Sequence, residues 1–233
     1  MGEQKRTAAA GFGRGHRTAL AAYAVLLAAS WWRPHWPAEQ ALHHSLTALA
    51  FAAIALVWRR YRIPLASWLL ILLFLALHTV AARWLYSYVP YDHWTQAVAG
   101  FRLSDALGLG RNDFDRLVHF SYGLCLAPVL ARWLRDARGW RPGRAAAAGV
   151  EIVVSTGAVY ELLEWLVAVG LSPGTAEAYN GQQGDMWDSQ KDMATALLGA
   201  VIGAGCAWWT VRGRRATEPA AAEQPRPTSA AVR

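Results

Sequence analysis

Six apolar segments constrain most strongly what this chain can fold into. A helix needs about 20 mainly apolar residues to cross the hydrocarbon core of a bilayer. Six stretches reach or approach that length, namely residues 18–32, 41–58, 65–85, 113–134, 145–170 and 188–210. Inside lipid the backbone must satisfy its own hydrogen bonds, which a helix does within a single segment. The sequence therefore predicts an all-α fold, a polytopic membrane helix bundle with about six transmembrane helices.

The expected organisation is one membrane domain with a polar tail at each end. We expect a disordered basic N-terminal tail over residues 1–17, a six-helix membrane domain over 18–211 and a disordered C-terminal tail over 212–233. The start of the chain also resembles a secretory signal peptide, because a basic stretch and an apolar run precede Ala28-Ala29-Ser30. The sequence leaves open whether the first helix is removed, which would leave five spans.

The basic residues indicate the orientation of the helices. When six helices are threaded through a membrane, 17 of the 23 Lys and Arg residues fall on the side that holds both termini. Cytoplasmic loops carry such an excess, so we predict a multi-pass protein of the bacterial cytoplasmic (inner) membrane with both termini inside. The net charge of +7 is distributed as in a membrane protein, so we expect the lipid bilayer as partner and no nucleic acid. Oligomeric state is left open.

Ionisable side chains within or beside the apolar segments mark the candidate site. Seven of them map to the outer side of the membrane: Asp115, His119, Glu161, Glu164, Asp185, Asp188 and Asp192. Each costs roughly 2.5–3.5 kcal/mol in hydrocarbon. Within each of three helices they stand three or four residues apart and so share a face. Small residues follow on that face, as in Gly199-x-x-x-Gly203, which favours close helix packing. We expect the three helices to direct these groups into a common interior.

Histidine and carboxylates from several helices suit a divalent metal ion, although ligand type does not separate Zn, Mn and Fe. The expected ligands are His119, Asp115, Glu161, Glu164, Asp188 and Asp192, with His78 and Asp185 as weaker candidates. A metal-bound water could hydrolyse a phosphate or acyl bond. The candidates for catalytic roles are Asp115, His119, Glu161 and Glu164. The alternative is a hydrogen-bonded ion network in which Arg116 and Lys191 offset part of the charge and some carboxylates are protonated.

Several polar residues also have simpler interpretations. Asn112 or Asp113 is placed to cap the helix predicted over 113–134, and Asp185 or Asp188 the helix predicted over 188–210. Capping is the expected role of Asp113 and Asp185. His43 and His44 are interpreted as interfacial or packing residues of the second segment. The long outer loop over residues 87–112 is expected to fold back over the bundle as an amphipathic or re-entrant cap.

Three sequence blocks carry a family resemblance. They are RNDFDRLVHF at 111–120, YELLEW at 160–165 and GQQGDMWDSQKDM at 181–193. In this order they resemble the YjdF-like family of bacterial inner-membrane proteins, over about residues 78–203. The resemblance implies a polytopic inner-membrane protein and brings no established activity. His78 lacks the Glu and Gly that often follow it in the family, and Phe114 replaces a common Tyr.

A second resemblance is more distant. Asp115-Arg116-x-x-His119-Phe120, together with Asp192 and the glycines that follow it, is similar to VanZ-like proteins linked to glycopeptide-antibiotic resistance. This similarity implies a role in the cell envelope.

Three functional hypotheses follow, and whether the chain is an enzyme is left open. The first is an inner-membrane protein with a cation-binding pocket near the outer leaflet that binds or acts on lipid or lipid-linked headgroups. The second is a proton- or ion-coupled transporter that uses the same carboxylates as a relay. The third is a structural or regulatory membrane scaffold in which the ion network only fixes helix packing.

Overall fold

The computed structural model describes residues 12–170 and 181–217. Its helices are α1 (Arg14–Ser30), α2 (Pro37–Trp58), α3 (Leu65–Arg83), α4 (Tyr91–Ala99), α5 (Leu103–Leu107), α6 (Phe114–Arg138), α7 (Pro142–Gly170) and α9 (Asp188–Thr217). The described part of the chain contains no β-strand. Five of the six long helices described begin and end within four residues of the expected segments, whereas α9 ends seven residues later than expected. The first starts before the expected domain limit at residue 18, and the last continues beyond residue 211. Of the two tails expected to be disordered, residues 1–11 and 218–233 lie outside the described residues.

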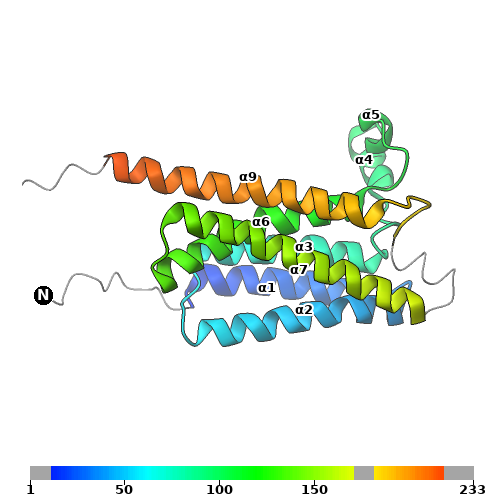
Figure 1. Ribbon diagram of the computed structural model, residues 1–233. Coiled ribbons are helices and arrows are strands. Elements are labelled where there is room, and N and C mark those ends of the chain that lie inside the picture. Colours follow the sequence, from blue (N-terminus) through cyan, green and yellow to red (C-terminus); the bar gives the residue numbers. More distant parts are fainter. Residues whose placement is uncertain (1–11, 171–180, 218–233) are drawn as a thin grey trace, which may run out of the picture.

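Six long helices lie side by side in an up-and-down bundle, so the first turn of α1 and the end of α9 lie at the same end (Figure 1). Five of them, α2, α3, α6, α7 and α9, are long and apolar enough to cross a membrane by length and composition. Helix α1 has 17 residues, which is the lower limit of a spanning helix. These features confirm the prediction of an all-α, polytopic membrane helix bundle.

The apolar surface of the bundle fits a lipid environment. Large apolar side chains on α2, α7 and α9 are more than half exposed, among them Leu49, Leu162 and Trp209. Helices that are apolar on all sides are found in protein cores or in membranes. Because these side chains lie outside the core of the bundle, hydrocarbon is the solvent that suits them.

Helices α6 and α9 approach each other very closely along small residues. A Cβ atom on Gly199 would collide with the backbone carbonyl of Phe120, and one on Gly123 would collide with that of Ala196. Glycine is thus required on both helices, which confirms the close packing that the Gly199-x-x-x-Gly203 pattern predicts. The contact aligns the outer halves of α6 and α9, where the candidate site lies.

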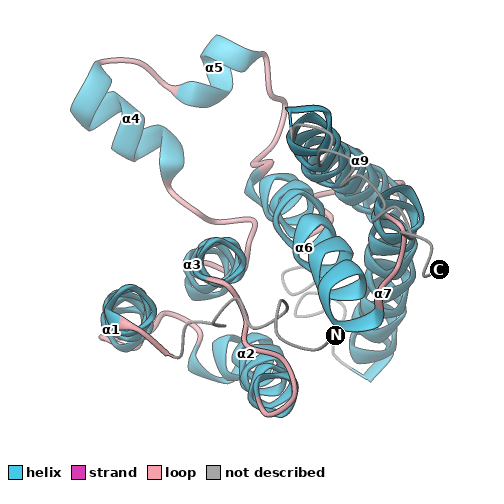
Figure 2. Cartoon of the chain, turned by 90° about the vertical axis from the view of Figure 1, so that its left-hand side faces the viewer, coloured by secondary structure: helices cyan, strands magenta, loops and turns pink. Residues whose placement is uncertain are grey.

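The outer loop between α3 and α6 forms the short helices α4 and α5. They lie beside the outer end of the bundle and do not cover it (Figures 1 and 2), so the expectation of a folded-back cap was wrong. Their polar groups bind each other, since the Asp92 carboxylate accepts hydrogen bonds from the Ser104 backbone N–H and hydroxyl and from Arg102. Val98 and Leu107 remain strongly exposed, as expected for amphipathic segments that lie in the headgroup layer.

Candidate functional site

The candidate site lies where α6, α7 and α9 meet, in the halves of these helices that the distribution of basic residues predicts to face the outer side. The structure brings the ionisable residues from these helices together in two adjoining groups. The first, called the arginine layer here, lies at the helix ends and consists of Arg111, Asp113, Asp115, Arg116, Asp185, Asp188 and Lys191. The second, called the histidine layer, consists of His119, Glu161 and Asp192.

Arg111 is the centre of the arginine layer. Its Nη1 donates to Asp188 at 2.5 Å, and its Nη2 donates to the Asp115 carboxylate. The same two nitrogens donate to the backbone carbonyls of Gln182 and Gly181 at 3.0 Å each. Because this side chain is only 12% exposed, its ion pairs are shielded from water. Arg111 therefore connects the loop before α9 to the start of α6 through its hydrogen bonds.

The turn before α9 is fastened a second time. The Gln183 side-chain oxygen accepts the Asn112 backbone N–H at 3.1 Å, and its amide nitrogen donates to the Asn112 carbonyl at 2.9 Å. Gly181 and Gly184 have φ values of +72° and +81°, which glycine adopts without strain. The turn at these glycines thus positions the backbone that Arg111 binds.

Arg116 and Lys191 complete the arginine layer. Arg116 pairs with Asp113 at 2.8 Å and with Asp185 at 2.7 Å, and Lys191 pairs with Asp185 at 2.6 Å. The hydrogen bond from Lys191 is the main cause that lowers the pKa of Asp185 below its usual range. These carboxylates are therefore neutralised by neighbouring cations.

Of the two residues expected to cap helices, Asp113 does not cap α6, whereas Asp185 binds a backbone N–H just before α9. Asp113 occupies the N-cap position of α6 but makes no side-chain cap hydrogen bond, so its expected capping role was wrong. The Phe114 N–H instead donates to the Asn112 side chain at 3.2 Å, because Asp113 is paired with Arg116. Asp185 accepts the backbone N–H of Trp187 at 3.1 Å, just before α9 begins.

The charge balance predicted from the sequence omitted Arg111 and was wrong in that respect. Arg116 and Lys191 were the expected counter-charges, but Arg111 binds both Asp115 and Asp188. Its position four residues before Asp115 was a visible signal. The pairing with Asp188, 77 residues away, depends on tertiary structure.

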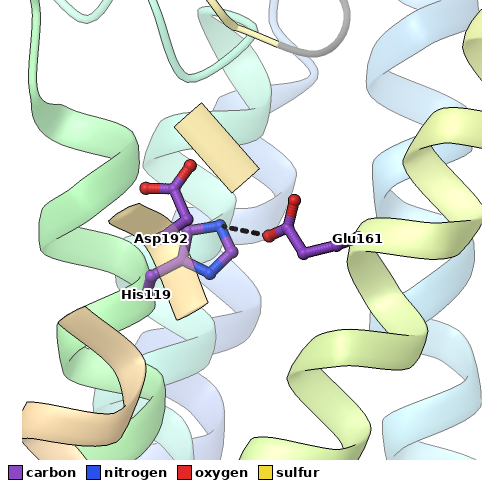
Figure 3. A group of neighbouring side chains, drawn as sticks. All are labelled: His119, Glu161 and Asp192. Carbon is purple, nitrogen blue, oxygen red and sulfur yellow. Dashed lines mark ion pairs between the residues drawn. The ribbon is translucent and has the colours of Figure 1, made fainter. Parts of the chain in front are cut away.

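The histidine layer joins one side chain from each of three spanning helices. His119 on α6, Glu161 on α7 and Asp192 on α9 each offer one ligand atom, and these atoms lie within 4.8 Å of one another. The Nε2 of His119 is 3.7 Å from Oε1 of Glu161 (Figure 3). Glu161 and Asp192 are buried, and their Oε1 and Oδ1 atoms have no hydrogen-bond partner among the described residues. A buried carboxylate oxygen in this state is costly unless a positive group neutralises it.

Asp192 links the two layers, and Glu164 lies beside the histidine layer. Asp192 also lies within 4.8 Å of ligand atoms of Asp115 and Asp188, so it faces both groups. Glu164 is partly buried one helical turn from Glu161 and has Glu161 and Asp192 as charged neighbours. It extends the acidic lining of the site but belongs to neither group of three residues whose ligand atoms lie within 4.8 Å of one another.

His78 belongs to a different cluster, between α2 and α3. Its Nδ1 is hydrogen-bonded to the Tyr86 hydroxyl, and its Nε2 is 3.3 Å from the His43 carbonyl. His43 is completely buried, with its ring 4.9 Å from that of Tyr86. His43 is thus an interior packing residue and not an interfacial one. The stripe of Gln40, His43 and Thr47, all buried, was the signal that the sequence offered for this cluster.

Fold and site together define a multi-pass helical membrane protein with buried acidic and histidine groups that could hold a metal ion. Residues 15–213 match the family described as Predicted membrane protein (DUF2238), and the chain belongs to this family. It is similar to the Inner membrane protein YjdF of Escherichia coli (strain K12), with 36% identity over 145 residues. This stretch covers 61% of the chain and 65% of the relative, which is less than two thirds of the relative's length.

These comparisons confirm the resemblance to the YjdF-like family and a multi-pass localisation in the inner membrane. No solved structure matches the chain.

Proposed function

We propose that this membrane protein binds a divalent cation through His119, Glu161 and Asp192, and uses it to bind or act on lipid or lipid-linked headgroups at the outer leaflet. One observation carries this proposal. Two buried carboxylate oxygens, on Glu161 and Asp192, lie beside one imidazole and have no hydrogen-bond partner in the described part of the chain.

The division of charge between the two layers supports a cation. The acidic groups of the arginine layer have guanidinium or ammonium partners within 4.0 Å. Among the described residues, no Lys or Arg forms such a pair with Glu161, Glu164 or Asp192, and His119 is the partner of Glu161. Buried charges require compensation, and one divalent ion offsets two carboxylates. The alternative network of internal ion pairs accounts for the arginine layer, but in the histidine layer it requires the buried carboxylates to be protonated.

The ligand set is typical of a metal site with open coordination positions. Three protein ligands leave room in the coordination shell for water or a substrate oxygen, as catalytic metal sites do. Imidazole nitrogen with two carboxylates suits Zn²⁺, Mn²⁺ and Fe²⁺. A bound ion would polarise a phosphoryl or carbonyl oxygen. Glu164, one turn away on α7, is the candidate for accepting a proton.

The depth of the site supports a headgroup as its ligand. At 1.5 Å per residue, His119 lies about 8 Å below the start of α6, and Asp192 about 6 Å below the start of α9. With the helix starts in the outer headgroup layer, as the predicted threading has them, this is the level at which polar headgroups meet the hydrocarbon. The neighbouring residues Leu162 and Trp165 of α7 are about 60% exposed, so lipid can reach this side of the bundle. The phosphate or ester group of a lipid is therefore the chemistry within reach.

Elemental analysis tests the cation. The full chain, purified in mild detergent, should hold about one divalent ion per protein, and His119→Ala or Asp192→Asn should lose it. Asp136→Asn is the matched control, because Asp136 lies at the opposite end of α6. An ion-free parent that Zn²⁺, Mn²⁺ and Fe²⁺ fail to stabilise against heat would contradict the proposal. So would a parent and an Asp192→Asn variant with equal metal content.

A spectroscopic experiment tests the headgroup part. Glycerol 3-phosphate carries a lipid headgroup without acyl chains, and it should change the electron paramagnetic resonance spectrum of the Mn²⁺-loaded protein. An unchanged spectrum with this compound and with phospholipid vesicles would restrict the site to a structural ion.

A further inference from the structure

A second candidate site lies at the opposite end of the bundle. An apolar groove of about 330 Å³ runs between α2 and α6, with α3 at its base. Figure 2, seen from that end, shows how α2, α3 and α6 are arranged. Its walls include Ala53, Val57, Ile71, Leu126, Leu130 and Trp133. The groove is separate from the histidine layer and from the function proposed for it.

The shape and lining of the groove fit a hydrocarbon chain. Along α6 it extends from Leu126 to Trp133, a distance of about 10 Å at 1.5 Å per residue. A methylene group and a water molecule each occupy about 30 Å³. A groove of this volume therefore holds about ten carbons. All three helices around it are candidate membrane spans, so the groove lies at hydrocarbon depth.

The mouth of the groove carries an excess of positive charge. Tyr61 lines the groove, and its hydroxyl donates to Asp136 at 3.4 Å. Asp136 also pairs with Arg132 at 3.3 Å and with Arg135 at 2.9 Å. Arg62, next to Tyr61, lies over the Trp58 ring at 5.9 Å. Two guanidinium groups thus pair with one carboxylate, and a third lies over a neighbouring ring.

Tyr61 can serve this mouth as a hydrogen-bond donor. Burial raises the pKa of its hydroxyl above the usual value of 10.0, so the group keeps its proton at neutral pH. A phosphate at the mouth would replace Asp136 as the acceptor of this long hydrogen bond and would also meet the neighbouring guanidinium groups.

We propose that the groove binds one anionic phospholipid, with an acyl chain between α2 and α6 and its phosphate against Arg62 and Arg132. Charge complementarity selects this occupant, because basic pockets between membrane helices attract anionic headgroups. The apolar walls of the groove suit the acyl chain of the same lipid. On the orientation predicted from the basic loops, the lipid comes from the cytoplasmic leaflet.

Native mass spectrometry of the full chain tests the headgroup preference. The protein is offered equal amounts of phosphatidylglycerol and phosphatidylcholine with the same acyl chains. The parent should retain phosphatidylglycerol preferentially, and Arg62→Gln and Arg132→Gln should each reduce this preference about fivefold. Arg144→Gln is the control, because it makes the same charge change on α7, which does not line the groove. Equal retention of both lipids by the parent would overturn the proposal.

A pair of substitutions on α2 tests the groove itself. Ala53→Phe fills the groove, whereas Ala55→Phe adds the same ring to a position that does not line it. Both variants should keep their helical circular dichroism, and only Ala53→Phe should lose bound phosphatidylglycerol. Equal lipid retention by the two variants would contradict the proposal. A dimer that Ala53→Phe dissociates would assign the groove to a second copy of the chain and would likewise overturn it.

Discussion

Substitution of Arg111 should destabilise the protein more than that of any exposed arginine. The Arg111 side chain is 12% exposed, and its partners Asp115 and Asp188 are 6% and 3% exposed. Arg111→Gln would leave two buried carboxylates without their main counter-charge. Breaking a buried ion pair by removing one partner costs about 3–5 kcal/mol, so we expect the free energy of unfolding to fall by that amount.

Unfolding of the purified protein by SDS, followed by tryptophan fluorescence, measures this loss. The control is Arg102→Gln, because that arginine is 57% exposed and pairs at the surface, where ion pairs contribute little. In the Arg111→Gln background, Asp188→Asn should recover part of the stability, because it removes one of the uncompensated charges. If Arg111→Gln were as stable as Arg102→Gln, the assigned role of Arg111 would be wrong.

Three further predictions concern packing, pH and orientation. Gly199→Ala should lower the stability of the α6–α9 pair, because its Cβ would meet the Phe120 backbone. A Cβ at Gly205 has open space around it, so Gly205→Ala should be neutral or stabilising by up to ~1 kcal/mol. Equal stability of the two variants in SDS unfolding would refute this. Hydrogen bonds from Ser104 lower the pKa of Asp92. The stabilisation from the hydrogen bonds between α4 and α5 should therefore be fully present above pH ~3.9 and be lost as the pH falls through the lower pKa of Asp92 in the folded protein. An NMR titration of the Asp92 carboxyl carbon checks this, and a midpoint at or above 3.9 would disagree. In a cysteine-free background, Ala106→Cys should react with an impermeant maleimide in intact cells and Ala137→Cys should not; the reverse labelling would invert the predicted orientation.

The sequence predicted the fold well because each spanning helix has its own local signal. Apolar length alone located the six long helices, and it did so because lipid requires every backbone group to be paired within a helix. The small residues of α9 correctly predicted a close helix contact, since Gly199 meets the Phe120 backbone. The outer loop was predicted less well, because its interactions, such as that of Asp92 with Ser104, occur within the loop itself.

The candidate site was predicted in part. Helical spacing correctly indicated that side chains of α6, α7 and α9 converge, and His119, Glu161 and Asp192 lie within ligand distance. The separation into two layers was missed because it depends on Arg111, which precedes α6 and reaches Asp188 on α9. Spacing along one helix contains no information about such a long-range pair. Whether the histidine layer binds an ion stays a prediction.

The central claim is that His119, Glu161 and Asp192 hold a divalent cation together. X-ray absorption spectroscopy at the edge of the metal found in the purified protein measures this most directly. The account predicts a first shell of nitrogen and oxygen donors at about 2.0–2.2 Å, with the imidazole signal absent in His119→Ala. A metal-free protein, or an imidazole signal unchanged by His119→Ala, would contradict it.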